Sequence, residues 1–103
     1  MRSNETLDGV VVALCRDYFR RCEAIKCAVY TSRTLMEYQY YNFKIFDGAA
    51  EIVGEEAAEK YIYEIGESSG YGNSRVVDVS EPVYKRKKNE VKRNIAKKLH
   101  LAD

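Results

Sequence analysis

Tryptophan, proline, histidine and long apolar runs are scarce or missing in this chain of 103 residues. It contains no tryptophan, one proline and one histidine. Its longest uncharged apolar run, from Val10 to Cys15, is far shorter than the roughly 20 residues that cross a bilayer. No apolar signal region follows the first residues. We therefore expect a soluble cytoplasmic protein with no membrane segment.

Residue types that carry catalysis are equally sparse. The three cysteines, Cys15, Cys22 and Cys27, are odd in number and lack the C-x-x-C spacing, which is typical of packing residues in a reducing compartment. His100, the only histidine, lies near the end of the chain, where catalysis would need a terminal residue held in place. The sequence therefore predicts no enzyme, no catalytic site and no cofactor.

An acidic repeat is the one pattern that suggests metal ligands. It places carboxylates at every fourth position, at Asp47, Glu51, Glu55 and Glu59. Gly54 interrupts the repeat, and no histidine or cysteine joins it. A solvated acidic face is therefore favoured over a metal site.

Charge is distributed unevenly, although the net charge is only +1. Residues 47–67 carry seven acidic side chains against Lys60, whereas residues 84–98 carry eight basic side chains against Glu90. Positive potential concentrated at one end of a small molecule attracts anions. The acidic segment is a solvated face, a partner surface or a region that neutralises the basic end, and these alternatives stay open.

Apolar residues recur at three- and four-residue intervals along most of the chain, which predicts a single all-α domain of four main helices. The first helix begins at Ser3 or Asn4 and carries its apolar face as far as Cys22. The second opens with a capping box formed by Thr34 and Glu37.

Glycine and proline mark the ends of the later helices. Gly54 is placed to end the second helix, and the third stops near Gly66. The sequence Ser80-Glu81-Pro82 begins the last helix, because serine caps a helix and proline suits its first turn. We expect this basic C-terminal helix to run to about Leu101.

Between the third and last helices the pattern is weaker. Residues 67–74 are rich in turn formers and predict a loop. Residues 75–79 suit a short strand or a short helix, and a helical turn is favoured because the sequence offers no partner strand. We therefore divide the single domain, residues 1–103, into a helical scaffold and oligomerisation part, 1–66, and a part with the loop and the basic helix, 67–103.

The second helix is apolar or aromatic around much of its circumference. One stripe holds Leu35, Tyr38, Tyr41, Asn42 and Ile45, and a neighbouring stripe holds Met36, Tyr40, Phe43 and Phe46. Such a helix contacts more than one element or faces a second copy of the chain, so a homodimer through this tyrosine-rich helix is one hypothesis. Because the tyrosines lie away from the lysines, a core or dimer role is favoured over stacking on nucleic-acid bases.

The last helix separates an apolar seam from a basic face. At about 100° per residue, the seam is formed by Tyr84, Val91, Ile95 and Leu99. The opposite side carries Lys85, Arg86, Lys92, Arg93 and Lys97, whereas Lys88 lies on the apolar side, where its long stem can reach water. A basic face of about four turns suits nucleic-acid phosphates, or its first turns can enter a major groove about 12 Å wide. A merely solvated face is the alternative.

The C-terminal part of the chain also carries a family resemblance. Its motif is Ile65-Gly66, a turn-rich segment, Ser80-Glu81-Pro82-Val83-Tyr84-Lys85-Arg86-Lys87, and the seam Ile95-Ala96-Lys97-Lys98-Leu99. This order resembles the C-terminal half of the helix-turn-helix in phage transcription regulators of the ArpU and RinA kind, which share the fold of the promoter-binding region 4 of sigma factors. The resemblance implies a helix-turn-helix that is degenerate, because Gly70-Tyr71-Gly72-Asn73 stands near the place of its first helix. It also implies that Ser80 caps the recognition helix, that Lys85 to Lys88 face DNA and that Tyr84 packs in part.

The leading hypothesis is a non-enzymatic transcription regulator of phage or prophage type that binds double-stranded DNA. The residues that we expect at the interface are Lys85, Arg86, Lys87, Lys88, Lys92, Arg93 and Lys97. Within this set, Lys85, Lys88, Lys92 and Arg93 would neutralise phosphates, and Arg86 and Lys87 are candidates for reading guanine edges.

Two rival hypotheses belong to other classes. One is a protein-interaction module, for example a phage-encoded inhibitor that docks its basic helix on an acidic host surface or its acidic segment on a host nucleic-acid-binding protein. The other is a structural assembly protein driven by the tyrosine-rich helix.

Overall fold

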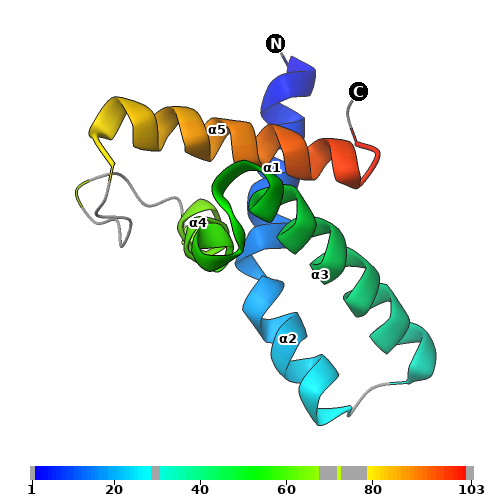
Figure 1. The fold of residues 1–103 in the computed structure, drawn as a ribbon. Coiled ribbons are helices and arrows are strands. Elements are labelled where there is room, and N and C mark those ends of the chain that lie inside the picture. The colour runs from blue at the N-terminus through cyan, green and yellow to red at the C-terminus, as the bar shows by residue number, and fades with distance from the viewer. Residues whose placement is uncertain (1, 29–30, 68–71, 73–78, 102–103) are drawn as a thin grey trace.

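The computed structural model describes residues 2–28, 31–67, 72 and 79–101, which fold as helices around one core. The helices are α1 (Arg2–Arg16), α2 (Tyr18–Cys27), α3 (Ser32–Val53), α4 (Glu55–Glu67) and α5 (Glu81–Lys98). No residue in these ranges lies in a strand, which confirms the predicted all-α fold. Figure 1 shows α5 lying across α1 and the C-terminal end of α3.

The first expected helix is divided into two, α1 and α2. The described residues therefore hold five helices instead of the four that we predicted. α1 and α2 meet at Asp17, whose backbone has φ −92° and ψ 2°. The buried Arg21 donates from Nη2 to the Leu14 carbonyl beside this break, and from Nε to Asn42 Oδ1 on α3 at 2.7 Å. Asn42 Nδ2 donates in turn to the Tyr18 carbonyl at 3.0 Å. Asn42 of α3 therefore satisfies the Tyr18 carbonyl and the Arg21 guanidinium at the break. The local pattern of apolar residues does not reveal these contacts.

The start of α3 also differs from the prediction, whereas its end agrees. Thr31, in extended backbone, is the N-cap, and its Oγ1 accepts from the Thr34 backbone N at 3.3 Å. The capping box predicted at Thr34 and Glu37 is therefore wrong, because Thr34 already lies in the first turn. Gly54 ends the helix as predicted, with φ +89° and its N–H donating to the Ala50 carbonyl at 2.8 Å.

Helix α5 begins after Ser80 with Pro82 in its first turn, as predicted, although the Ser80 side chain makes no capping hydrogen bond. It ends at Lys98, before the predicted Leu101. His100 adopts φ +61° and its N–H donates to the Lys97 carbonyl at 3.0 Å, while the Leu101 N–H donates to the Ala96 carbonyl at 2.8 Å. These paired bonds form a Schellman motif, so the only histidine closes the helix.

Most of the segment between α4 and α5 lies outside the described residues. The loop predicted over 67–74 and the helical turn predicted over 75–79 fall largely in that part of the chain.

The core is built where α1, α3, α4 and α5 meet. Its fully buried side chains include Val11, Cys15, Ile45, Ile62, Ile65, Tyr84, Val91 and Ile95. Helices α3 and α5 approach closely at Gly48, where a Cβ would lie 3.0 Å from the Ile95 Cα. This close crossing fixes which face of α5 points inward.

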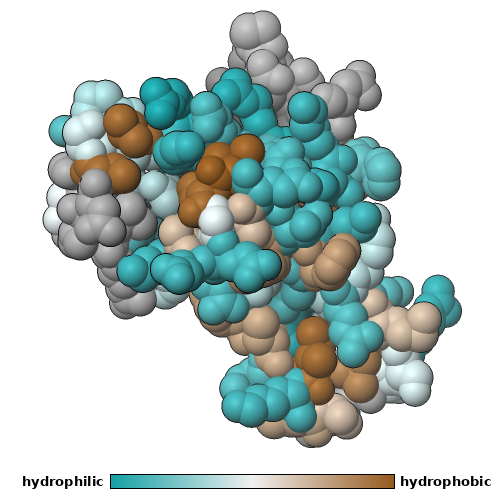
Figure 2. Space-filling view, in the orientation of Figure 1, coloured by the Kyte–Doolittle hydropathy of each residue, from teal (hydrophilic) through white to brown (hydrophobic). Residues whose placement is uncertain are grey.

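Helix α2 and the N-terminal half of α3 extend away from this core as a two-helix arm (Figure 1). The space-filling view shows apolar surface on the arm next to hydrophilic surface (Figure 2). The cysteines follow the same division: Cys15 is buried in the core, Cys22 is partly buried, and Cys27 at the end of α2 is exposed. The prediction that all three are packing residues is therefore wrong for Cys27.

Candidate nucleic-acid interface

The inner side of α5 is the apolar seam that the sequence predicted. Tyr84, Val91 and Ile95 are at most 1% exposed, and Leu99 is 8% exposed. Tyr84 stacks on Tyr61 of α4 with ring centroids 5.9 Å apart, and its hydroxyl donates to the buried Glu64 Oε1 at 2.6 Å. The opposite side of α5 therefore faces outward.

The outer side of α5 carries a row of exposed cations, which we call the basic stripe. Its members are Lys85, Arg86, Arg93 and Lys97, with the uncharged Asn89 between them. The stripe spans twelve residue steps, about 18 Å at the helical rise of 1.5 Å. B-DNA carries one phosphate charge per about 1.7 Å of axis when both strands are counted, so a duplex segment of this length carries about ten charges.

Local carboxylates touch the first half of the stripe only weakly. Lys85 Nζ lies 3.0 Å from Glu81, and Arg86 Nε lies 3.9 Å from Glu90, both one helical turn apart and exposed. Such exposed pairs contribute about 0.3–0.5 kcal/mol and are screened by salt, so a phosphate can displace them. Arg93 and Lys97 form no ion pair within the described ranges.

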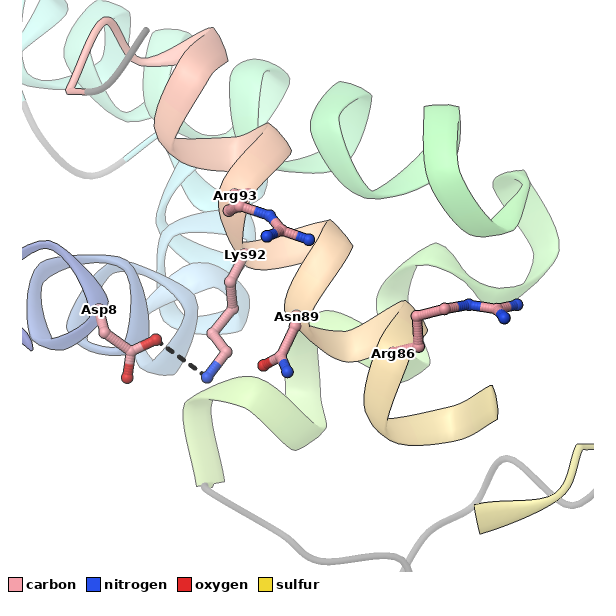
Figure 3. Close-up of a pocket in the computed structure, with 5 residues that line it drawn as sticks. All are labelled: Asp8, Arg86, Asn89, Lys92 and Arg93. Carbon is pink, nitrogen blue, oxygen red and sulfur yellow. Dashed lines mark ion pairs between the residues drawn. The ribbon is translucent and has the colours of Figure 1, made fainter. Parts of the chain in front are cut away.

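Three predicted interface residues, Lys87, Lys88 and Lys92, do not belong to the stripe. Lys92, whose side chain is 21% exposed, reaches Asp8 of α1 at 2.9 Å. Figure 3 shows this pair beside Asn89, with the guanidinium groups of Arg86 and Arg93 pointing away from it. These five residues line a shallow depression of about 290 Å³. Lys92 thus ties α5 to α1.

Lys88 lies on the inner side, as the helical wheel predicted. Its ammonium group is 5.7 Å from the centre of the Tyr84 ring. Burial lowers the pKa of Lys88, and the nearby Lys92 lowers it further. Lys87, the remaining predicted residue, is partly buried at the edge of the stripe.

The acidic segment meets α5 at the last turn. Lys98 Nζ contacts Asp47 at 3.0 Å and Glu51 at 2.5 Å, and Asn94 Nδ2 donates to Glu51 at 3.0 Å. Hydrogen bonds from Asn94 and Lys98 lower the pKa of Glu51, and those to Glu51 and Asp47 raise the pKa of Lys98. Among the open alternatives for the acidic segment, neutralisation therefore occurs at this turn, and two carboxylates of the acidic repeat bind Lys98.

The helix-turn-helix is not confirmed. In the described ranges the helix before α5 is α4, and residues 68–80 separate them. A helix-turn-helix joins its two helices by a turn of about three or four residues.

Comparison of the chain with protein-family models, with curated proteins and with solved structures gives no match. The resemblance to the ArpU and RinA regulators therefore stays a prediction. No described helix is long and apolar enough to span a membrane.

Sequence reasoning missed one feature of the surface and left another between two alternatives. Asn89 occupies the centre of the basic stripe, and its residue type gave no charge signal. The exposed apolar side chains of the arm, Met36, Tyr40 and Phe43, were expected in a core or a dimer interface, and they lie outside the core cluster that the described residues form.

Proposed function

We propose that this protein binds double-stranded nucleic acid, most directly duplex DNA, through the basic stripe of α5. The observation that carries the proposal is the alignment of four exposed cations on one face of a helix whose other face is anchored in the core. A rigid, outward-facing row of cations releases counterions from the phosphate backbone when it binds.

Within the stripe, the side chains suit different contacts. Lys85, Arg93 and Lys97 are placed to meet phosphates, while Arg86 has the planar fork that pairs with guanine O6 and N7. Lys88 and Lys92 serve the fold in this proposal, since they contact Tyr84 and Asp8. A role in transcription regulation, and a phage setting, are part of the proposal on the strength of the sequence resemblance alone.

The proposal is tested by removing cations at matched sites. We expect the double variant Arg93→Ala/Lys97→Ala to bind a labelled mixed-sequence duplex about 100-fold more weakly than the wild type at about 50 mM salt. The control double variant Lys26→Ala/Lys60→Ala removes the same charge from exposed positions on α2 and α4. The two variants share one net charge, so fluorescence anisotropy separates the stripe from overall charge. Equal affinities of the two variants would contradict the proposal.

A second candidate function is docking of the same stripe on an acidic protein surface. It is favoured by the carboxylates already found on α5, Glu81 on Lys85 and Glu90 on Arg86. Recovery of one stoichiometric protein partner, together with no duplex binding by the wild type, would favour this function.

A further inference from the structure

The exposed side of α3 carries an ordered set of side chains that the basic stripe does not use. We call it the α3 outer face, and it consists of Arg33, Met36, Glu37, Tyr40, Phe43, Lys44 and Asp47. At about 100° per residue, these seven positions fall within an arc of about 120°. Met36 is 67% exposed, Phe43 is 66% exposed and Tyr40 is 45% exposed, so large apolar side chains are open to solvent from one edge of this face to its middle.

The charges on this face follow a repeating order about Tyr40. Arg33 lies seven residues before Tyr40 and Asp47 seven residues after it. Glu37 lies three residues before Tyr40 and Lys44 four residues after it. Reversing the helix about Tyr40 therefore places each cation opposite an anion, whereas a parallel pairing places like charges together.

The apolar shape is complementary in the same direction. A hollow of about 550 Å³ lies on the N-terminal half of the face and is lined by Arg33, Met36, Glu37, Tyr40 and Tyr41. Phe43 stands three residues beyond Tyr40 and is largely exposed. In the reversed orientation, Phe43 of a second copy lies opposite Met36 and Glu37, two residues that line the hollow.

We propose that the α3 outer face binds a second copy of this chain, with the two α3 helices antiparallel and a twofold axis near Tyr40. Phe43 of each copy fills the hollow of the other, and the pairs Arg33–Asp47 and Glu37–Lys44 form between copies. A twofold interface uses one patch on both subunits, so self-complementary charge and shape on a single face are its requirement.

The contacts within one chain are weak enough to be replaced by contacts with a second copy. Arg33 and Glu37 lie 3.8 Å apart with side chains 91% and 59% exposed, so their pair is weak. Lys44 lies over the Tyr40 ring at 5.7 Å. Asp47 shares Lys98 with Glu51, and Lys98 keeps Glu51 when Asp47 turns to the second copy.

The test measures self-association by sedimentation equilibrium over a concentration series, without nucleic acid, so its outcome is independent of the proposed duplex binding. We expect a monomer–dimer equilibrium for the wild type. Phe43→Ser should weaken it about 100-fold, because an aromatic anchor leaves its pocket. The control Glu67→Lys changes an exposed charge on α4 and should leave the dimer unchanged.

A charge exchange tests the antiparallel arrangement itself. Glu37→Lys and Lys44→Glu should each weaken the dimer about tenfold, since each places like charges opposite one another at two related positions. The double variant Glu37→Lys/Lys44→Glu should recover the wild-type dissociation constant. A monomeric wild type, a large oligomer, or a double variant as weak as the singles would overturn the proposal.

Discussion

Helices α5 and α3 share an amphipathic arrangement, but their exposed faces differ in side-chain type: that of α5 is cationic and that of α3 is partly apolar. Each helix buries an apolar seam and leaves the other side exposed, and the two meet at Gly48 and Ile95. The exposed side of α5 is cationic, whereas the exposed side of α3 leaves the apolar side chains of Met36 and Phe43 about two-thirds exposed. The difference is the basis of both proposals: exposed cations act on a partner at long range, whereas exposed apolar side chains need a closely packed one.

The largest expected effect comes from a cross-test of the two faces. Arg93→Ala/Lys97→Ala should weaken binding to a duplex of one helical turn about 100-fold and leave the dimer constant unchanged. Phe43→Ser should weaken the dimer about 100-fold and leave that duplex affinity unchanged, because one turn admits a single α5. Anisotropy and sedimentation on the same preparations measure both. If either variant impairs both properties alike, the two faces are not separate.

A smaller effect is expected where the two helices touch. Gly48→Ala places a Cβ 3.0 Å from the Ile95 backbone, which should lower the free energy of unfolding by about 1–3 kcal/mol. The matched change Gly9→Ala on α1 meets nothing within 4 Å and should raise the free energy of unfolding by about 0.5–1 kcal/mol. Urea denaturation distinguishes them. A Gly48→Ala protein as stable as the wild type would show that α5 does not press closely on α3.

The smallest effect concerns the core beneath both faces. Burial raises the pKa of the Cys15 thiol to about 12, whereas an unfolded thiol ionises near 9. The unfolded chain therefore loses a proton first, and stability present below pH 9 is lost as pH rises toward 12. We expect the free energy of unfolding to fall by about 1.4 kcal/mol between pH 8 and pH 10. In the Cys15→Ala variant, the fall in the free energy of unfolding between pH 8 and pH 10 should be smaller. An equal fall in the variant and the wild type would argue against a buried thiol at Cys15.

The fold class and the apolar seam of α5 could be predicted because both depend on local periodicity. Tyr84, Val91, Ile95 and Leu99 are all buried, as the helical wheel required. The break at Asp17 could not be predicted in the same way, since the apolar period continues through it. Its polar groups are satisfied by Arg21 and by Asn42 of α3, through hydrogen bonds that depend on how α3 packs against α1 and α2.

The candidate site was predictable in charge and less so in geometry. The side of the helix that Lys85, Arg86, Arg93 and Lys97 occupy follows from spacing alone. The pairing of Lys92 with Asp8 depends on how α1 crosses α5, and that of Lys98 with Asp47 and Glu51 depends on the close contact at Gly48. Contacts between distant segments thus decided which of the predicted cations face outward.

The most direct test of the central claim is the salt dependence of duplex binding. With three phosphate contacts, from Lys85, Arg93 and Lys97, the logarithm of the binding constant should fall against the logarithm of salt concentration with a slope of about −2.7, and Arg93→Ala/Lys97→Ala should reduce that slope to about −0.9. A wild-type slope near zero, or the same slope in the double variant, would contradict the assignment of the basic stripe as the nucleic-acid interface.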